Sequence, residues 1–275
     1  MKEISFSTLI LSLVVMFPTQ NLKADEDNSL ARFINEHHAA LVTVKYVLTI
    51  NMGNLGGNKE MDSENELTCS MISAKGLVVC SNNQLSGFLG LMKQFSKSSG
   101  DEMSATPRDI KVLVDGQNES FDAAIVARDT ELDMIWLQVV NTGLKPFSFI
   151  DFSDHAETGI DEPILIIRRM ASSFGRAPVI SRSRIGGMTS KPRKLYVPGN
   201  AMMNGAGLAV FAEDGRPVGL VVTQLPEVGE NTNSFSNMTG SGMANLQDAM
   251  SGMILPASDV ALATRRALET MESQQ

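Results

Sequence analysis

Between residues 41 and 255 the chain consists of short apolar segments separated by turn residues, and this pattern constrains its fold more than any other feature. The segments are rich in Val, Ile and Leu, which is typical of β-strands. No helical periodicity intervenes, and Asp115-Gly116 and Asp214-Gly215 are strong signals for tight turns. About six segments fall in each half, so the sequence predicts an all-β fold with two packed six-stranded antiparallel barrels. The expected strands are 41–50, 67–72, 77–81, 110–114, 121–128 and 133–140, then 163–168, 178–185, 194–197, 208–211, 218–223 and 252–255.

Short helices are expected at both ends of this β region. Asn28 or Ser29 can cap an N-terminal helix, and Ser258 can cap a C-terminal one. A chain of 275 residues is long enough to bury the core that two barrels require. The sequence therefore predicts one domain, residues 25–275, with barrel one at about 40–145, barrel two at about 146–256 and the C-terminal helix at about 258–272.

The first 24 residues have the features of a secretory signal peptide. Lys2 precedes an apolar run over residues 6–17, and a small residue, Ala24, stands at the expected cleavage point. The run is too short for a stable membrane span, although an uncleaved N-terminal anchor is the alternative. The signal predicts a secreted or periplasmic protein with no integral membrane span after its removal.

The charge balance argues against nucleic acid as a partner. The formal net charge is −8, and removal of the signal makes it more negative, so the protein would repel phosphate backbones. The three histidines and two cysteines lack metal-ligand spacing, and no phosphate-binding loop is present. We therefore expect no metal and no cofactor.

Cys69 and Cys80 flank a plausible tight turn at residues 73–76. If 67–72 and 77–81 form a hairpin centred between residues 74 and 75, the two cysteines face each other directly. A cross-strand disulfide then fits the geometry and an oxidising compartment, while two buried free thiols are the alternative.

Three polar stretches interrupt the strand pattern. They are rich in Gly, Ser, Asn and Met and are expected to be surface loops. They cover residues 51–66, 93–107 and 227–251.

Two segments lie in the first half of the expected β region and carry recognisable motifs. Residues 76–85 read Gly-Leu-Val-Val-Cys-Ser-Asn-Asn-Gln-Leu, and residues 132–137 read Leu-Asp-Met-Ile-Trp-Leu. They resemble the segments that deliver the catalytic histidine and aspartate in HtrA/DegP-type proteases of the trypsin-like superfamily. On this resemblance Gln84 occupies the histidine position and Asp133 the aspartate position.

Two further segments extend the resemblance over about residues 29–272. Residues 204–211 read Asn-Gly-Ala-Gly-Leu-Ala-Val-Phe and resemble the motif around the catalytic serine, with Ala206 at the nucleophile position. Residues 252–256, followed by a helix, resemble the end of the protease domain. The PDZ module that often follows this domain is not expected here.

The resemblance implies a protease scaffold without protease chemistry. Acyl transfer in this fold needs a hydroxyl nucleophile, an imidazole base and an orienting carboxylate. Ala206 has no nucleophile, and the amide of Gln84 is not a useful base near neutral pH. Backbone N–H groups of Gly205, Ala206 and Gly207 are expected to be the remnant of the oxyanion hole.

Three functional hypotheses follow. The first is a catalytically inactive trypsin-like protein that binds an extended peptide or a protein partner by strand addition. The second is an active serine endopeptidase in which another serine and histidine meet. The third is a structural envelope protein that acts through its loops. A homo-oligomer is compatible with all three hypotheses.

Overall fold

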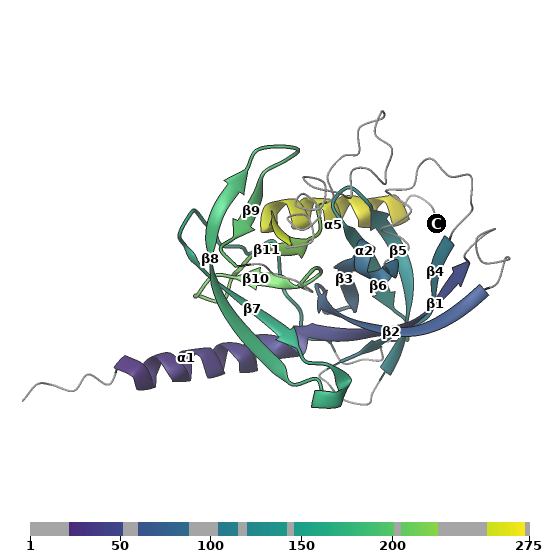
Figure 1. Cartoon of the computed structure of the whole chain (residues 1–275), viewed down its shortest axis with the longest axis horizontal. Coiled ribbons are helices and arrows are strands. Elements are labelled where there is room, and N and C mark those ends of the chain that lie inside the picture. Colours follow the sequence, from purple (N-terminus) through teal and green to yellow (C-terminus); the bar gives the residue numbers. More distant parts are fainter. Residues whose placement is uncertain are drawn as a thin grey trace, which may run out of the picture.

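The computed structural model describes residues 22–51, 60–87, 104–114, 120–141, 146–200, 205–224 and 252–272. Its strands form two closed antiparallel barrels, with the orders β1-β2-β3-β6-β5-β4 and β10-β11-β12-β9-β8-β7 (Figure 1). The first barrel contains β1 (Leu41–Asn51), β2 (Glu60–Met71), β3 (Leu77–Ser81), β4 (Ser104–Leu113), β5 (Ser120–Asp129) and β6 (Met134–Val139). The second contains β7 (Pro163–Arg169), β8 (Pro178–Thr189), β9 (Leu195–Pro198), β10 (Ala209–Phe211), β11 (Pro217–Val222) and β12 (Met253–Pro256). The prediction of two six-stranded barrels with terminal helices is confirmed.

Five short helices accompany the barrels in the described part of the chain. They are α1 (Leu22–His37), η1 (His38–Ala40), α2 (Asn82–Leu85), η3 (Ser172–Phe174) and α5 (Ala257–Glu272). None of these helices combines the length and the apolar character that a membrane crossing requires.

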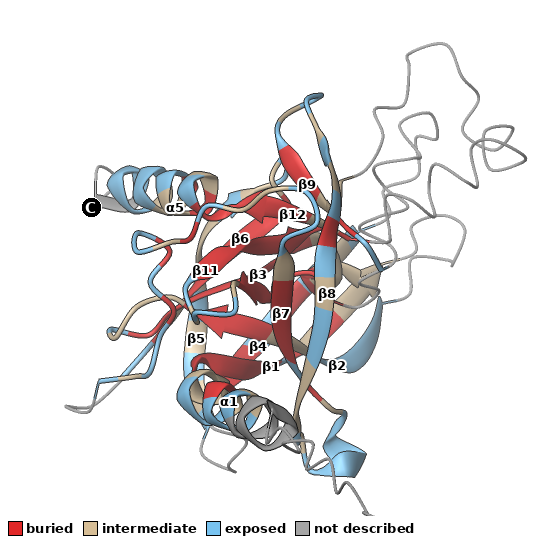
Figure 2. Cartoon of the chain, turned by 90° about the vertical axis from the view of Figure 1, so that its left-hand side faces the viewer, coloured by how far each residue is buried: buried red, intermediate tan, exposed pale blue. Residues whose placement is uncertain are grey.

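The C-terminal helix α5 packs on both barrels. Val260 is fully buried, and the indole Nε1 of Trp136 on β6 donates a hydrogen bond of 3.1 Å to Thr264 Oγ1. Trp136 belongs to the apolar core. That core includes side chains of both barrels, and Figure 2 shows the buried strands beneath the exposed outer face of α5. The helix therefore joins the barrels through shared apolar burial.

The N-terminal helix begins earlier than its sequence signals predict. We expected a cap at Asn28 or Ser29, but α1 starts at Leu22. Phe33 is buried against Phe211 of β10, with ring centroids 5.3 Å apart in an edge-to-face arrangement. This contact holds the end of α1 on the second barrel, whereas residues 1–21 lie outside the described part of the chain.

Two of the three expected loops are shorter than predicted. The stretch 51–66 contains the start of β2 at Glu60, and the stretch 93–107 contains the start of β4 at Ser104. The polar half of β2 becomes a strand because β1 pairs with it without a register break from Leu41↔Ser70 to Asn51↔Glu60. The third stretch, 227–251, lies outside the described residues.

The predicted disulfide is present. Ser70 pairs with Val79 in the β2–β3 ladder, so Cys69 and Cys80 stand directly opposite each other, as expected. Their sulfur atoms are bonded at 2.08 Å, and their Cα atoms are 4.8 Å apart. Gly76 closes the turn with a φ of 84°, and its N–H donates to Ser73 O. The disulfide adds a covalent bond between β2 and β3, which pair with each other at only two residues of β2, Ser70 and Met71.

Removal of the bridge is expected to destabilise the fold. Both cysteines are fully buried, and the double variant Cys69→Ala/Cys80→Ala removes the bond that closes the short loop between them. Closure of so short a loop in the unfolded chain contributes about 2–3 kcal/mol to the free energy of unfolding. Urea unfolding of the variant measures this loss. Wild-type protein in excess reductant is the control and should lose a similar amount. Unchanged unfolding midpoints in both samples would contradict the expectation.

Candidate functional site

The segment that carries Gln84 is a short helix capped by a serine. β3 ends at Ser81, whose Oγ accepts a hydrogen bond of 3.1 Å from Gln84 N and so caps α2. The carbonyl oxygen of Gln84 accepts a hydrogen bond of 3.1 Å from the hydroxyl of Tyr46 on β1. These two bonds fix the backbone of Gln84, and its side chain is half-buried.

Asp133 lies immediately before β6 and connects the two barrels. Its side chain is buried, with 1% of its surface exposed, and its backbone has a left-handed φ of 56°. Oδ1 accepts a hydrogen bond of 2.7 Å from Asn83 N in the first barrel. Oδ2 accepts one of 2.8 Å from Thr223 N, just after β11 in the second barrel. Ser81 Oγ lies 3.0 and 2.9 Å from the two carboxylate oxygens and donates its single proton to this group.

The electrostatic state of Asp133 reflects two opposing effects. Burial raises the pKa of this carboxyl to about 6, because a charge is poorly solvated inside the protein. The N–H groups of Asn83 and Thr223 and the hydroxyls of Ser81 and Thr223 lower the pKa, but less than burial raises it. Near neutral pH most of the carboxyl is ionised and is held by these donors.

Ala206 lies in a tight turn that leads into β10. Leu208 N donates to Gly205 O at 3.0 Å, and Gly207 is the third residue of this turn with a φ of 88°. A positive φ at that position is typical of a type II turn and favours glycine. Ala206 is only 5% exposed. Ser70 of β2 fastens the turn to the first barrel, because its Oγ donates to Gly207 O at 3.0 Å and accepts from Ala209 N at 3.1 Å.

The turn packs directly against the end of β3. A Cβ on Gly207 would lie 2.9 Å from Ser81 N and 3.3 Å from the backbone of Cys80. Ser81 therefore touches three parts of the site: its Oγ bonds Asp133 and the Gln84 amide, and its backbone meets Gly207. The structure thus brings the segments of Gln84, Asp133 and Ala206 into one neighbourhood between the barrels.

One of the three expected oxyanion donors has a hydrogen-bond partner within the fold. Gly207 was expected to offer its N–H to an oxyanion, but this N–H donates to Val221 O at 2.7 Å. A donor that is committed to a carbonyl of β11 cannot stabilise a developing negative charge. The described contacts leave the roles of the Gly205 and Ala206 N–H groups as a prediction.

The histidines lie at other places in the fold. His37 packs between Phe33 and Phe211, with ring centroids 4.5 and 4.8 Å away, and burial lowers its pKa. His38 Nδ1 lies 2.9 Å from Ile34 O. His155 Nε2 is 3.7 Å from Glu157 Oε1. Each histidine therefore has local contacts, and the donors on the Asp133 carboxylate are Ser81, Asn83 and Thr223.

Sequence reasoning missed two of the residues that hold this site. Ser81 had a local signal, because Ser81-Asn82-Asn83-Gln84 fits the Ser-x-x-Gln pattern of a helix start. Thr223 had none, since it is 90 residues from Asp133 in the chain and reaches it only through the packing of the barrels.

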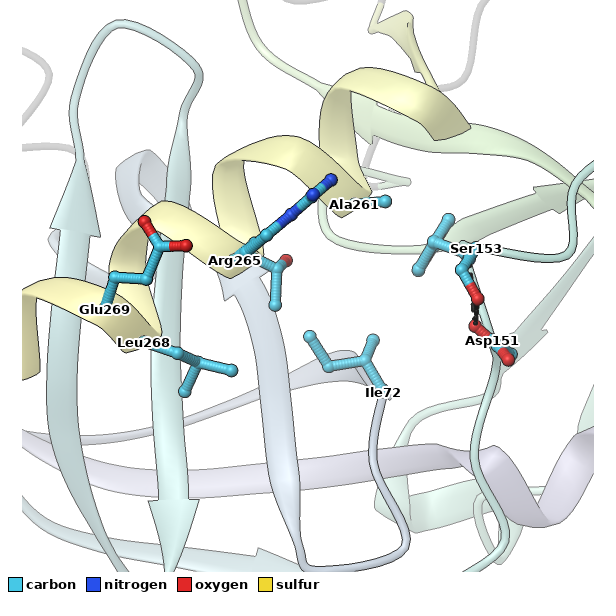
Figure 3. A pocket seen from close by; sticks show the side chains of 9 residues that line it. Ile72, Asp151, Ser153, Ala261, Arg265, Leu268 and Glu269 are labelled. Atoms are coloured by element: carbon cyan, nitrogen blue, oxygen red, sulfur yellow. Dashed lines mark hydrogen bonds between the residues drawn. The ribbon is translucent and has the colours of Figure 1, made fainter. Parts of the chain in front are cut away.

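A separate cleft of about 370 Å³ lies beside α5 and does not include Gln84, Asp133 or Ala206. Ile72 and Leu268 line it from different segments, and Ser153 Oγ donates to Asp151 Oδ1 at 2.6 Å on another side (Figure 3). The candidate site is therefore the junction around Ser81, and the cleft is a distinct feature.

Two closed six-stranded barrels, with this junction between them, define a trypsin-like fold. The crystal structure of Deg5 is similar to this chain, with a TM-score of 0.50 and 13% sequence identity over 72% of this chain and 86% of that chain. At that identity the likeness shows the fold alone and does not extend to the chemistry. No family model matches the chain, and no curated protein matches it in sequence.

Proposed function

We propose that this protein is an exported, catalytically inactive trypsin-like protein that binds an extended segment of a partner protein. One observation carries the proposal: the turn at the nucleophile position presents a buried methyl group, that of Ala206, instead of a hydroxyl. The carboxylate that would orient an imidazole is instead occupied by Ser81, Asn83 and Thr223. The disulfide between Cys69 and Cys80 is compatible with export into an oxidising compartment.

The missing groups decide against useful hydrolysis. Loss of triad members in this type of enzyme leaves about 10³–10⁴-fold catalysis over water, which comes from the oxyanion hole and binding. Here one of the expected oxyanion donors, Gly207 N–H, is also committed to Val221 O. The remaining acceleration would be negligible for the cleavage of a peptide bond.

Binding needs none of the missing groups. Thr223 and Gln224 follow β11 (Pro217–Val222) as half-buried residues, and Thr223 N donates to Asp133. Backbone next to the end of a strand can accept an extended peptide by strand addition, in which main-chain hydrogen bonds provide the affinity. We place the partner at this end of β11, between the barrels.

A fluorophosphonate probe and a fluorogenic protein substrate test the loss of catalysis. We expect no labelled serine and no hydrolysis above buffer for the wild-type protein. We expect the same for Ala206→Ser, because a serine without an imidazole is not activated. A trypsin-like protease of known activity is the positive control. Labelling of one serine in the folded wild-type protein would overturn the proposal of inactivity.

Binding is tested separately, with an array of extended peptides and hydrogen exchange at residues 222–224. The expected result is slower exchange at the Gln224 amide with a bound peptide, because Thr223 N already donates to Asp133 and Val222 already pairs with Met253. Peptide binding that leaves the exchange of Gln224 unchanged would contradict the proposed place, whatever the outcome of the labelling.

A further inference from the structure

Among the described residues, one side of β2 has a strand partner only near the end of the strand. β1 pairs with β2 along the whole of β1, from Leu41↔Ser70 to Asn51↔Glu60. On the opposite side, β3 pairs with β2 only at Ser70 and Met71. Within the described part of the chain, the outer edge of residues 60–68 therefore has no strand partner. In Figure 1, β2 runs to the right-hand side of the first barrel, next to β1.

The pairing pattern shows which backbone groups face this edge. Ile72 N donates to Leu77 O at 2.8 Å, so Ile72 directs its N–H and C=O groups toward β3. In an antiparallel strand these groups alternate from one side to the other with each residue. The even-numbered residues of β2 therefore direct their backbone groups outward. Since the β1–β2 register has no break, Glu60, Asp62 and Glu64 present theirs at the open edge.

The contacts of Glu66 limit the length of this edge. Its Oε1 accepts a hydrogen bond of 3.2 Å from Ser172 N, and its Oε2 accepts one of 2.8 Å from Arg176 Nη2. The end of the β7–β8 hairpin thus lies next to Glu66. The accessible edge is residues 60–64, and all five of these residues are exposed.

The side chains that accompany the outward backbone groups are acidic. Glu60, Asp62 and Glu64 are two residues apart, so they share one face of the strand. Asp62 is already paired, because it accepts hydrogen bonds of 2.6 Å from Arg108 Nη2 and 2.8 Å from Thr49 Oγ1. Glu60 and Glu64 have no ion pair with the described residues. At 3.3 Å per residue, Glu60 and Glu64 are about 13 Å apart along the strand. They lie on either side of Asp62, whose charge is already paired.

We propose that residues 60–64 of β2 form a second binding edge, which takes an extended segment of another protein with Lys or Arg at positions i and i+4 and an uncharged residue at i+2. The backbone of the segment extends the sheet through the outward groups of Glu60, Asp62 and Glu64. Its two cations lie opposite Glu60 and Glu64 on the same face, where opposite charges stabilise a cross-strand pair. The uncharged residue lies opposite Asp62, which Arg108 already neutralises.

A second copy of this chain does not fit the same edge. Antiparallel self-pairing centred on Asp62 would place Glu60 opposite Glu64 and Asp62 opposite itself. Like charges directly opposite each other destabilise a strand pair, so the acidic side chains oppose self-association. The inference does not depend on whether the protein hydrolyses peptides, and the site lies apart from the β11 end.

The spacing of the charges gives a direct test with the full chain. One fluorescent, blocked peptide reads Thr-Lys-Val-Thr-Val-Lys-Thr, with its lysines four residues apart on one face of a strand. Its isomer, Thr-Lys-Val-Thr-Lys-Val-Thr, has the same composition and charge but places the lysines on opposite faces. By fluorescence anisotropy at low salt, we expect the first peptide to bind at least tenfold more tightly. Hydrogen exchange should slow at amides 60, 62 and 64 when it binds.

A charge reversal and a matched control complete the test. Glu60→Lys/Glu64→Lys should weaken binding of the first peptide at least tenfold. Glu162→Lys/Glu269→Lys makes the same change in net charge at exposed sites on other elements and should leave the affinity unchanged. The proposal is overturned by equal affinities of the two peptides, by no binding of either, or by equal losses in the two double variants. Thermal melting of each variant shows that the fold is retained.

Discussion

Replacing Gly219 by alanine is expected to unfold the second barrel. Gly219 lies on β11, paired with Val210 of β10 on one side and Pro256 of β12 on the other. A Cβ at this position would lie 2.2 Å from Leu255 O and 2.6 Å from Ile254 Cγ2. Leu255 O belongs to the backbone of a buried strand, so no rotamer change relieves the clash. We expect a loss of at least about 4 kcal/mol, in the exceptional range for a single substitution.

The effect should reach the candidate site, because β11 carries two of its contacts. Val221 O accepts the Gly207 N–H, and Thr223 N follows the strand and donates to Asp133. Thermal unfolding followed by circular dichroism measures the loss of stability. Gly159→Ala is the matched control, since no atom lies within 4 Å of a Cβ there, and it should unfold like the wild type. A Gly219→Ala protein that melts like this control would contradict the clash.

The sequence was sufficient for the features that local signals determine. Alternating apolar segments and turn residues predicted two barrels, and the Asp214-Gly215 turn forms with a φ of 90° at Gly215. The length of the turn between their strands was enough to predict that Cys69 and Cys80 face each other. In each case the residues that specify the structure are close together in the chain.

The errors have two causes, a strand partner distant in the chain and a cap signal that lies inside a helix. The polar residues 60–66 have no strand signal, yet they form β2 because β1 is beside them. The start of α1 at Leu22 was missed because its predicted cap, at Asn28 or Ser29, lies inside the helix. A local cap signal does not exclude an earlier helix start.

The candidate site depends both on local sequence signals and on contacts between distant segments. Motif resemblance predicted Gln84, Asp133 and Ala206 as its positions, and their segments meet around Ser81. The hydrogen bonds at Asp133 could not be predicted, because Thr223 comes from the other barrel. The commitment of Gly207 N–H to Val221 O is likewise a contact between distant segments. The residue types alone indicate that a nucleophile and a base are absent from these positions. Only the packing of the two barrels shows which groups bond to Asp133 and to Gly207 N–H.

Asp133→Ala is the substitution at the site with the largest expected effect on stability. It leaves the N–H groups of Asn83 and Thr223 and the hydroxyl of Ser81 without their acceptor inside the protein. It also places alanine at a φ of 56°, which aspartate and asparagine tolerate better. We expect a loss of about 3–5 kcal/mol in urea unfolding. Asp161→Ala, at a φ of 69°, tests the same backbone strain with the loss of only an exposed ion pair to Arg184, and it should cost much less.

Asp133→Asn separates the charge of this group from its shape. Asparagine keeps one acceptor oxygen, but its NH₂ group must face either Asn83 N–H or Thr223 N–H, so we expect a loss of about 1–3 kcal/mol. The folded pKa of about 6 lies above the ordinary 3.8, so protonation stabilises the fold at low pH and this contribution is lost as pH rises through 6. The difference in unfolding free energy between wild type and Asp133→Asn should therefore be largest near pH 4 and shrink by pH 7. A difference that grows with pH over this range would show that the donors outweigh burial and hold the carboxylate as a stable ion.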